Sequence, residues 1–213
     1  MLNTIFCKQI LAYIFNRKKL LFNEKEKMLA GKVYNPSLDY NLFKERLQCK
    51  TLCYRYNNLS PDKVLQRNNL ISKIVGKVGK VYYLEQPFMC DYGYNIEFGE
   101  NFCSNHNLLI LDAGKVKFGD NVMVGPNCEF YATMHPLNTN RRLKGLQWAN
   151  PITICNNVWI CGNVTVLGGV TIGENSIIGA GSVVTRDIPP NSLAVGSPCK
   201  VIKSFVGSSF SGE

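Results

Sequence analysis

A six-residue period in the second half of the chain restricts the fold more than any other feature of the sequence. Aliphatic residues recur at strict six-residue spacing at Ile154, Ile160, Val166, Ile172, Ile178 and Val184. A second series follows four positions after aliphatic residues, at Val158, Val164, Val170, Ser176 and Ser182. Upstream, Phe98 and Ile110 are twelve apart, and after a two-residue insertion the series resumes at Phe118, Val124 and Phe130. A period of six fits neither an α-helix nor an alternating strand.

This period is typical of the hexapeptide class of β-solenoid. Each hexad supplies one short strand and a turn, so three hexads complete one coil of about 18 residues in a three-sided prism. The aliphatic residue then points to the axis in every coil and stacks on its counterpart in the next coil. No hexad buries its apolar side alone, so several coils must stack. We expect glycine or another small residue beside the aliphatic one to permit the tight corner.

The preceding segment carries helical periodicity. Asn23, with Glu26 three positions on, resembles a capping box and predicts a helix from Glu24 to near Gly31. Asp39 begins a second helical pattern, which carries Leu42, Phe43, Leu47, Leu52, Tyr54 and Tyr56. Ser60 and Pro61 predict the start of a third helix. Its expected inward residues are Leu65, Leu70, Ile71, Ile74 and Val75, with Gly76 at its end.

These patterns divide the chain into four parts. Residues 1–23 are a basic amphipathic extension, 24–76 a helical cap, 77–203 the repeat domain and 204–213 a tail. Residues 132–151 are polar and basic and lack dependable repeats, so we expect a loop that leaves the prism and returns. Long loops on a rigid scaffold are common sites of chemistry. The apolar run of residues 1–22 is too short and broken to span a bilayer. It either lies on a membrane or partner, or packs on the body.

Composition narrows the chemistry further. The 213 residues include 24 Lys and Arg against 15 Asp and Glu, and this net charge of +9 favours anionic partners. The nine cysteines contain no CxxC pair, which favours free thiols in a reducing cytosol and gives no sign of a metal site. Cys49 and Cys53 are expected to share a helix face as apolar filler. The only histidines are His106 and His135, so one chain cannot supply three imidazoles.

Several segments together resemble one family. They are EKEKMLAGKVY, CDYGYNI, NHNLLILDAGKVKFGDNV, the His-Pro at 135–136, PITICNNVWICGNVTV and VTIGENSIIGAGSVVTRDIPPNSLAVGSPCKVIK. Over residues 24–204 the chain resembles the maltose and galactoside O-acetyltransferases, and its cap resembles the maltose-type members. The resemblance implies a mainly β protein, a left-handed parallel β-helix with a small N-terminal helical cap. It also implies a homotrimer with sites between neighbouring prisms, and acetyl-CoA as the donor.

The resemblance also assigns the acceptor side of the site. His135 matches the catalytic histidine, a general base that takes the proton of a hydroxyl. Asn105 matches a residue that positions the acceptor or stabilises developing charge. Asp39 and Asp91 match acceptor-binding positions, and Trp159 matches an aromatic near the site. The alternatives are a solvated loop histidine, a turn asparagine, a helix N-cap for Asp39 and simple packing for Trp159.

On the donor side, the backbone at Gly162 and Ala180 matches positions that border pantetheine. Thr185, Arg186, Lys200 and Lys203 match the end of the prism that holds CoA, where cations neutralise phosphates. The alternative for these residues is a charged face that merely solvates the prism.

The chain departs from the family pattern at five positions. Ala113 stands where galactoside-type members have an Asp, and Gln147 where they have a Met, which leaves the sugar open. Cys155 and Cys161 replace turn glycines, so these corners must avoid positive φ or carry strain. Cys161 is expected to be a buried filler rather than a reactive thiol. His106 replaces an aromatic residue and is expected in packing or at a subunit interface.

The sequence therefore predicts a cytoplasmic, acetyl-CoA-dependent O-acetyltransferase that acts directly on a hydroxyl of a sugar or similar polyol and requires no metal. An antibiotic O-acetyltransferase of the same fold is the alternative. A non-catalytic solenoid that binds protein or membrane is a third possibility. A zinc carbonic anhydrase would need three histidine ligands. The scattered basic residues contain no nucleic-acid recognition motif.

Overall fold

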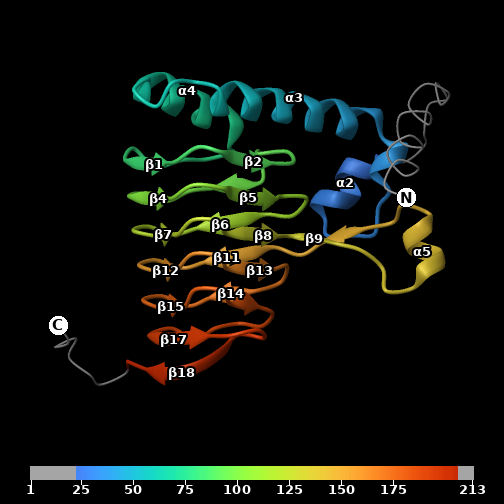
Figure 1. Cartoon of the computed structure of the whole chain (residues 1–213). Helices are drawn as coiled ribbons and strands as arrows, with labels where there is room; N and C mark the ends of the chain where they lie inside the picture. Colours follow the sequence, from blue (N-terminus) through green and yellow to red (C-terminus); the bar gives the residue numbers. More distant parts are fainter. Residues whose placement is uncertain (1–22, 206–213) are drawn as a thin grey trace.

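The computed structural model describes residues 23–205 as a three-sided parallel β-solenoid with helices over one end (Figure 1). The predicted solenoid fold is confirmed. In each coil the chain passes from a seven-stranded sheet to a five-stranded sheet and then to a four-stranded sheet, within the described residues. The basic extension 1–22 and the tail residues 206–213 lie outside the described residues.

Short strands form the three sheets. The seven-stranded sheet contains, in spatial order, β1 (Tyr82–Leu84), β4 (Phe102–Ser104), β7 (Met123–Val124), β12 (Trp159–Ile160), β15 (Ile177–Ile178), β17 (Ser192–Val195) and β18 (Lys200–Ser204). The five-stranded sheet contains β2 (Phe88–Cys90), β5 (Leu108–Leu111), β8 (Glu129–Tyr131), β13 (Thr165–Leu167) and β16 (Val183–Val184). The four-stranded sheet contains β3 (Ile96–Glu97), β6 (Val116–Phe118), β11 (Ile152–Ile154) and β14 (Thr171–Ile172). All pairs between neighbouring coils are parallel except that of β17 with β18.

The two predicted six-residue series line the interior of the prism. Both the Ile154 to Val184 series and the Val158 to Ser182 series are buried. Four phenylalanines fill the wider coils near the helical end: the Phe98 and Phe102 rings stack at 4.1 Å, and Phe118 meets Phe130 edge-on at 4.9 Å. The six-residue period therefore identifies the residues that stack along the axis of the prism and form its core.

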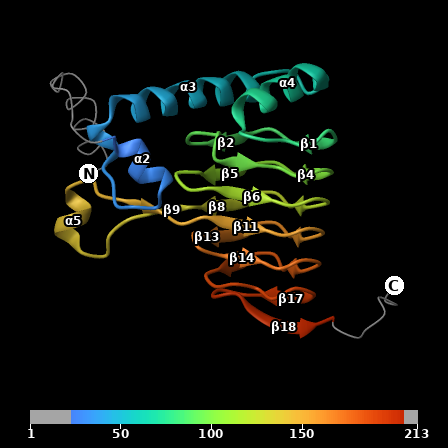
Figure 2. The ribbon, with the colours of Figure 1, turned by 180° about the vertical axis from the view of Figure 1, so that it is seen from behind.

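The helices that precede the solenoid in sequence fall into two groups. Helices α3 (Tyr40–Asn57) and α4 (Val64–Ile74) cover the first coil, and their buried residues Cys49, Cys53, Tyr56, Ile71 and Ile74 join the main core. Helix α2 (Glu24–Leu29) and the 3-10 turn η1 (Pro36–Leu38) lie beside the prism (Figure 2). They belong with a separate apolar cluster of Met28, Tyr34, Leu42, Tyr92, Ala113 and Ala149.

The start of the third helix was predicted wrongly. Pro61 and Asp62 form a turn, and α4 begins only at Val64, after an N-cap residue that makes no side-chain capping bond. Leu65 was expected inward but is 86% exposed, because the helix buries the face of Ile71 and Ile74. The expected cap of α2 is confirmed, since the Asn23 side chain accepts from the backbone N–H of Glu26.

Asparagine forms the left-handed turn along the edge where the four-stranded sheet leads into the seven-stranded sheet. Asn101, Asn121, Asn157, Asn175 and Asn191 all have φ between 55° and 60°, and their side chains form a ladder of hydrogen bonds along one edge. Of the two alternatives expected for Cys155 and Cys161, positive φ avoided or strain carried, the structure shows the first.

The corner glycines are needed for a different reason than expected. Gly119 does not have positive φ, but a Cβ atom there would lie 2.8 Å from the backbone N of Asn156 in the next coil. Stacking at hydrogen-bonding distance, with Gly119 N donating to Ile154 O at 2.8 Å, leaves no room for a side chain. Among the described residues, no helix is both long and apolar enough to cross a membrane.

We predict that Gly119→Ala lowers the free energy of unfolding by about 1–3 kcal/mol, because the new methyl group overpacks a rigid backbone contact. Cys155→Ala is the matched control: Cys155 occupies the same corner one coil on, already carries a Cβ, and should change stability far less. Urea unfolding measures both. Equal small effects would show that the close approach of the coils does not exclude a side chain.

Candidate functional site

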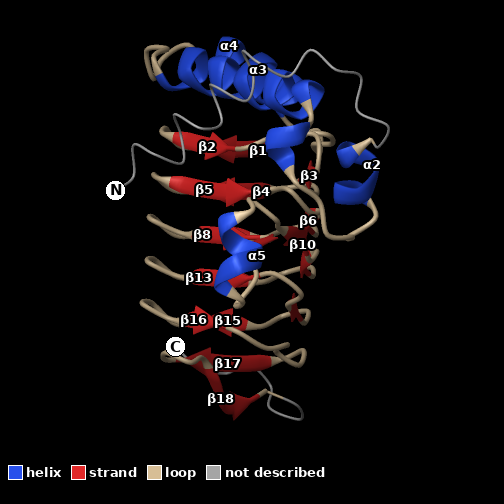
Figure 3. Ribbon diagram, turned by 90° about the vertical axis from the view of Figure 1, so that its right-hand side faces the viewer, coloured by secondary structure: helices blue, strands red, loops and turns tan. Residues whose placement is uncertain are grey.

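Residues 132–151 leave the prism as a structured arm. Strand β9 (Thr133–Met134) pairs antiparallel with β10 (Trp148–Ala149), with Trp148 opposite Met134. The short helix α5 (Thr139–Leu143) forms the tip, and Asn138 caps it by accepting from the backbone N–H of Arg141 at 3.1 Å. Figure 3 shows α5 standing out in front of the five-stranded sheet. Residues 132–151 depart from the prism and return to it, and the arm is more regular than the sequence indicated.

His135 follows β9 directly and is exposed. The chain after it is held by Arg142, whose Nη1 donates to the carbonyl oxygens of Pro136 at 2.8 Å and Leu137 at 3.0 Å. The imidazole is therefore presented to solvent from a turn that the arm itself fixes.

The arm is also clasped by the segment between α2 and η1. Tyr34 and Gln147 exchange two backbone hydrogen bonds, of 2.9 and 3.0 Å, and the Gln147 side chain donates to the Tyr34 hydroxyl. Asn35 Nδ2 donates to the carbonyl oxygen of Lys144 at 2.8 Å. Burial raises the pKa of Tyr34 to about 12, so the hydroxyl stays neutral. Gln147, one of the departures from the family pattern, thus joins the arm to the N-terminal segment.

Asp91 and Asp112 lie close together at the edge from which the arm leaves. We call this the excursion edge (residues 91–95, 112–115, 132–151, 168–170 and 185–187), where each strand of the five-stranded sheet ends. The buried Asp91 accepts from Arg46 Nε at 2.7 Å. Asp112 Oδ1 accepts from the backbone N–H groups of Asp91 and Tyr92, at 3.0 and 2.8 Å. Its Oδ2 is buried without a hydrogen-bond partner. Burial raises the pKa of Asp112 to about 6.

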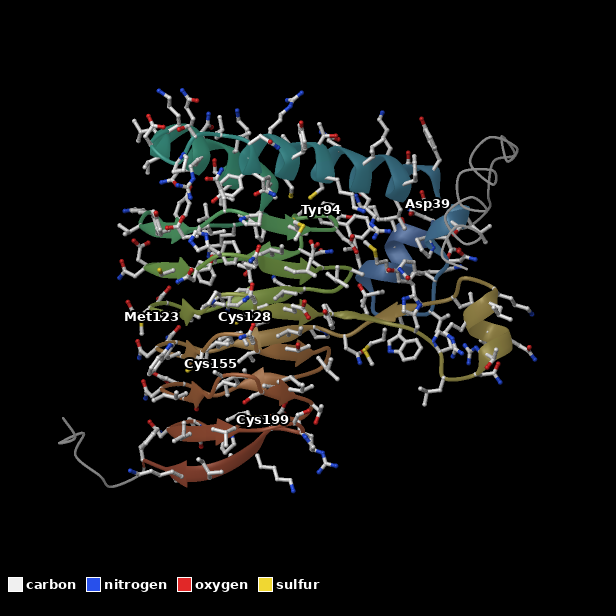
Figure 4. All side chains as sticks on the ribbon, viewed as in Figure 1. Asp39, Tyr94, Met123, Cys128, Cys155 and Cys199 are labelled. Carbon is white, nitrogen blue, oxygen red and sulfur yellow. The ribbon has the colours of Figure 1, made fainter. Side chains whose placement is uncertain are left out.

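Asp39 caps α3, in agreement with the alternative interpretation of this residue as a helix N-cap. Its Oδ1 accepts from the backbone N–H groups of Asn41 and Leu42, and its Oδ2 accepts from that of Lys25. Figure 4 shows Asp39 near α2, on the side of the molecule where the arm projects. An acceptor-binding role for Asp39 stays a prediction.

A second edge carries other predicted site residues. We call it the glycine edge (residues 85–87, 105–107, 125–127, 161–163 and 179–181), where the seven-stranded sheet leads into the five-stranded sheet. Asn105 is exposed there, and its Oδ1 accepts from the backbone N–H of His106 at 2.7 Å. His106 Nδ1 lies 2.6 Å from the carbonyl oxygen of Gln86, one coil away.

Gly162 and Ala180 lie on the glycine edge in successive coils, where Gly181 N donates to Gly162 O at 3.0 Å. Beside them, burial raises the pKa of the Cys161 thiol, which keeps it protonated. Cys161 is half-buried rather than buried as expected, and its protonated thiol fits a filler better than a reactive group. Trp159, on β12, is 47% exposed on the outer face of the seven-stranded sheet.

One chain therefore divides the predicted site between two edges. Asp91, the His135 arm, Thr185 and Arg186 belong to the excursion edge. Asn105, Gly162 and Ala180 belong to the glycine edge, with Trp159 on the neighbouring sheet face. Lys200 and Lys203 are exposed on β18, at the end of the seven-stranded sheet. Within the described chain these groups are not brought to one place.

Sequence reasoning missed Arg46, Asp112 and Arg142. The sequence does contain a signal for Asp112, which is a carboxylate directly after the apolar run LLIL. The sequence contains no such signal for Arg46 and Arg142, since their partners become neighbours only after folding.

Comparison with known proteins agrees with this architecture. A family model described as the maltose acetyltransferase hexapeptide capping motif matches residues 27–79, and one for bacterial transferase hexapeptide repeats matches residues 151–186. The galactoside O-acetyltransferase of Escherichia coli K12 is 45% identical over 180 residues, which are 84% of this chain and 88% of that protein.

Solved structures give the same result. A maltose O-acetyltransferase from Clostridium difficile 630 is 48% identical with a TM-score of 0.84, covering 87% of this chain and 98% of that one. A galactoside acetyltransferase in complex with coenzyme A is 41% identical with a TM-score of 0.84, covering 90% and 96%. With this identity over most of its length, the chain belongs to the maltose and galactoside O-acetyltransferase family of hexapeptide-repeat acyltransferases.

Proposed function

We propose that this protein transfers the acetyl group of acetyl-CoA to a hydroxyl of a sugar or similar polyol, with His135 as the general base. The observation that carries the proposal is the placement of His135, an exposed imidazole on a clamped arm, at the edge that also holds the carboxylate of Asp91. A neutral imidazole takes a proton near neutral pH, and carboxylates accept hydrogen bonds from sugar hydroxyls.

The proposed reaction is a direct transfer. The His135 ring takes the hydroxyl proton while the hydroxyl oxygen attacks the thioester carbonyl, and a tetrahedral oxyanion forms. The Asn105 amide donates to this oxyanion or orients the acceptor. Collapse expels the CoA sulfur, which receives the proton from the imidazolium. An acyl-enzyme on Cys161 is disfavoured, because burial raises the pKa of that thiol and disfavours the nucleophilic thiolate.

The proposed site lies between two copies of the chain in a homotrimer. His135 and Asn105 sit on different edges of one prism, so packing the excursion edge of one protomer against the glycine edge of its partner would bring them together. The outer face of the seven-stranded sheet supports this packing. Its outward column is apolar, with Tyr83, Cys103, Met123, Trp159, Ile177 and Leu193 in register.

The outer face of the four-stranded sheet is less suited to burial. The matching column of the four-stranded sheet is Glu97, Lys117, Thr153 and Thr171. Met123 and Trp159 are 53% and 47% exposed in one chain. Exposed apolar side chains in a contiguous patch are typical of an interaction surface.

The donor site is proposed on the same two edges and on β18. Related structures hold CoA or acetyl-CoA: the galactoside acetyltransferase above, and a Vibrio cholerae hexapeptide-repeat acetyltransferase that is 33% identical with a TM-score of 0.80, covering 86% of this chain and 98% of that one. Gly162 and Ala180 present little side chain to a pantetheine arm. The exposed side chains of Thr185, Arg186, Lys200 and Lys203 supply a hydroxyl and cations for the CoA phosphates.

The proposal that the acceptor is a sugar or similar polyol rests on the carboxylates. It does not rest on Ala113 and Gln147, the two departures from the family pattern on the acceptor side. Ala113 is buried in the apolar cluster beside Tyr92, and the Gln147 side chain is used by Tyr34. Asp91 is a carboxylate of the excursion edge, and Asp39 is its proposed partner in acceptor binding. All cysteines in residues 23–205 are free, which supports the proposed cytoplasmic location.

We predict that His135→Ala lowers the rate of CoA release from acetyl-CoA by about 10²–10⁴-fold with a panel of sugars and polyols as acceptors, since general-base catalysis contributes this much. A thiol-release assay measures it. The control is His106→Gln, which removes the other histidine and should cost less than about tenfold. Equal rates for His135→Ala and the unmodified enzyme would contradict the assignment of the base.

A mixing experiment tests the shared site. We predict that trimers co-assembled from His135→Ala and Asn105→Ala protomers regain activity that neither variant has alone. In a random equal mixture about a quarter of the interfaces join an intact His135 to an intact Asn105. Two affinity tags isolate the mixed trimers. Activity no higher than that of the two separate variants would show that both residues act within one chain.

Asp112 is proposed as a positioning residue, because its Oδ1 fixes the backbone N–H groups of Asp91 and Tyr92. Its pKa is raised to about 6, so the folded state binds a proton more tightly than the unfolded state. Stability should therefore fall as pH rises from about 4 to about 6, by up to about 3 kcal/mol, and then level off.

We predict that Asp112→Asn removes this part of the pH dependence in urea unfolding between pH 4 and 7. Asp62→Asn, in an exposed turn, is the control and should keep it. An unchanged slope in Asp112→Asn would show that this carboxyl does not take up the proton.

A further inference from the structure

Three cysteine thiols meet between helix α3 and strand β2. Cys49 and Cys53 lie one turn apart on α3, and Cys90 is the last residue of β2. The Cys90 sulfur lies 3.4 Å from that of Cys49 and 3.8 Å from that of Cys53. All three sulfurs lie within 4.8 Å of one another. Because Cys90 is distant in sequence, the spacing of the cysteines gave no sign of this thiol cluster.

The thiol cluster is buried and is held by two packed elements. Cys49, Cys53 and Cys90 are 3%, 4% and 4% exposed, and all three are free thiols. The sulfurs lie one helix below the surface, because α3 is the outer layer over the first coil (Figure 1). Within residues 23–205, no other group of three or more His, Cys, Asp or Glu side chains brings its donor atoms this close.

We propose that the thiol cluster binds one soft, thiophilic metal ion of the Cu⁺ type in three-coordinate geometry. An ion in the plane of three sulfurs, at a metal–sulfur distance of about 2.3 Å, needs sulfurs about 4.0 Å apart. The observed separations of 3.4 and 3.8 Å, with all three sulfurs within 4.8 Å, lie around this value. Small side-chain rotations therefore suffice to form the site.

The donor set selects the ion. Thiolate ligands favour Cu⁺ and Zn²⁺ over harder ions. Zn²⁺ takes four ligands, or three plus water at an open position. Among the described residues the cluster offers three donors, and its burial leaves little access for water. Each sulfur that bonds to the ion as a thiolate releases its proton to solvent.

The proposed ion would join the elements that hold Asp91. Cys90 immediately precedes Asp91, and Arg46, in the turn before Cys49 on α3, forms the ion pair with it. Binding to three sulfurs that only the folded chain assembles would raise the melting temperature. This proposal does not depend on the transfer reaction, so either can fail alone.

The test is an anaerobic titration of the reduced, metal-free full-length protein with Cu⁺ against a competing Cu⁺ chelator. An exposed thiol outside the cluster, such as Cys103, should lose the ion to the chelator. We expect one equivalent per chain to be retained, and X-ray absorption of the unmodified protein to show three sulfurs at about 2.3 Å. Cys49→Ser and Cys90→Ser should each lower the affinity at least tenfold, whereas Cys103→Ser should not.

Several outcomes would overturn the proposal: no retained copper, a two-sulfur spectrum, retention of Zn²⁺ but not Cu⁺, or equal affinity in Cys90→Ser and the unmodified protein. The spectrum of the unmodified protein decides the question even if a variant fails to fold.

Discussion

The structure depends on the stacking of one coil on the next at backbone hydrogen-bonding distance. Columns of buried side chains keep the coils in register, and a shift of one residue would turn each column from the core to the surface. The same close approach requires glycine at corners such as Gly119 and permits the asparagine ladder along that same edge. Because the coils stack at a fixed spacing, the backbone and side chains at each edge are held in fixed positions along the prism. The proposed function depends on this rigidity.

The arm turns this repetitive scaffold into a candidate enzyme. It is held at its base by β9 and β10, at its turn by Arg142, and from outside by Tyr34 and Asn35. The N-terminal segment and the arm are therefore one structural unit, although more than 100 residues separate Tyr34 from Gln147 in sequence. This unit presents His135 at one edge, while the proposed Asn105 and donor-binding backbone lie at another. A single prism carries both groups of proposed site residues but does not bring them together.

The sequence predicted what is periodic and local. The six-residue series identified the solenoid and its core, and the caps of α2 and α3 followed from Asn23 and Asp39. Ser60 and Pro61 predicted too early a start for α4, because the packing of Ile71 and Ile74 overrides this local start signal. The ion pair of Arg46 with Asp91, the buried Asp112 and the thiol cluster join residues from distant coils and helices, which no local pattern records. The resemblance supplied candidate residues, and the fold added their division between two edges.

The most direct test of the account is a crystal structure of the assembled protein with CoA bound. The account predicts that the CoA sulfur lies between the excursion edge of one protomer and the glycine edge of its partner. It also predicts that the His135 ring and the Asn105 amide, from different chains, lie within hydrogen-bonding reach of the space where an acceptor hydroxyl meets that sulfur. A structure in which CoA lies along one prism alone, or in which His135 points away from the sulfur in the assembled oligomer, would contradict it.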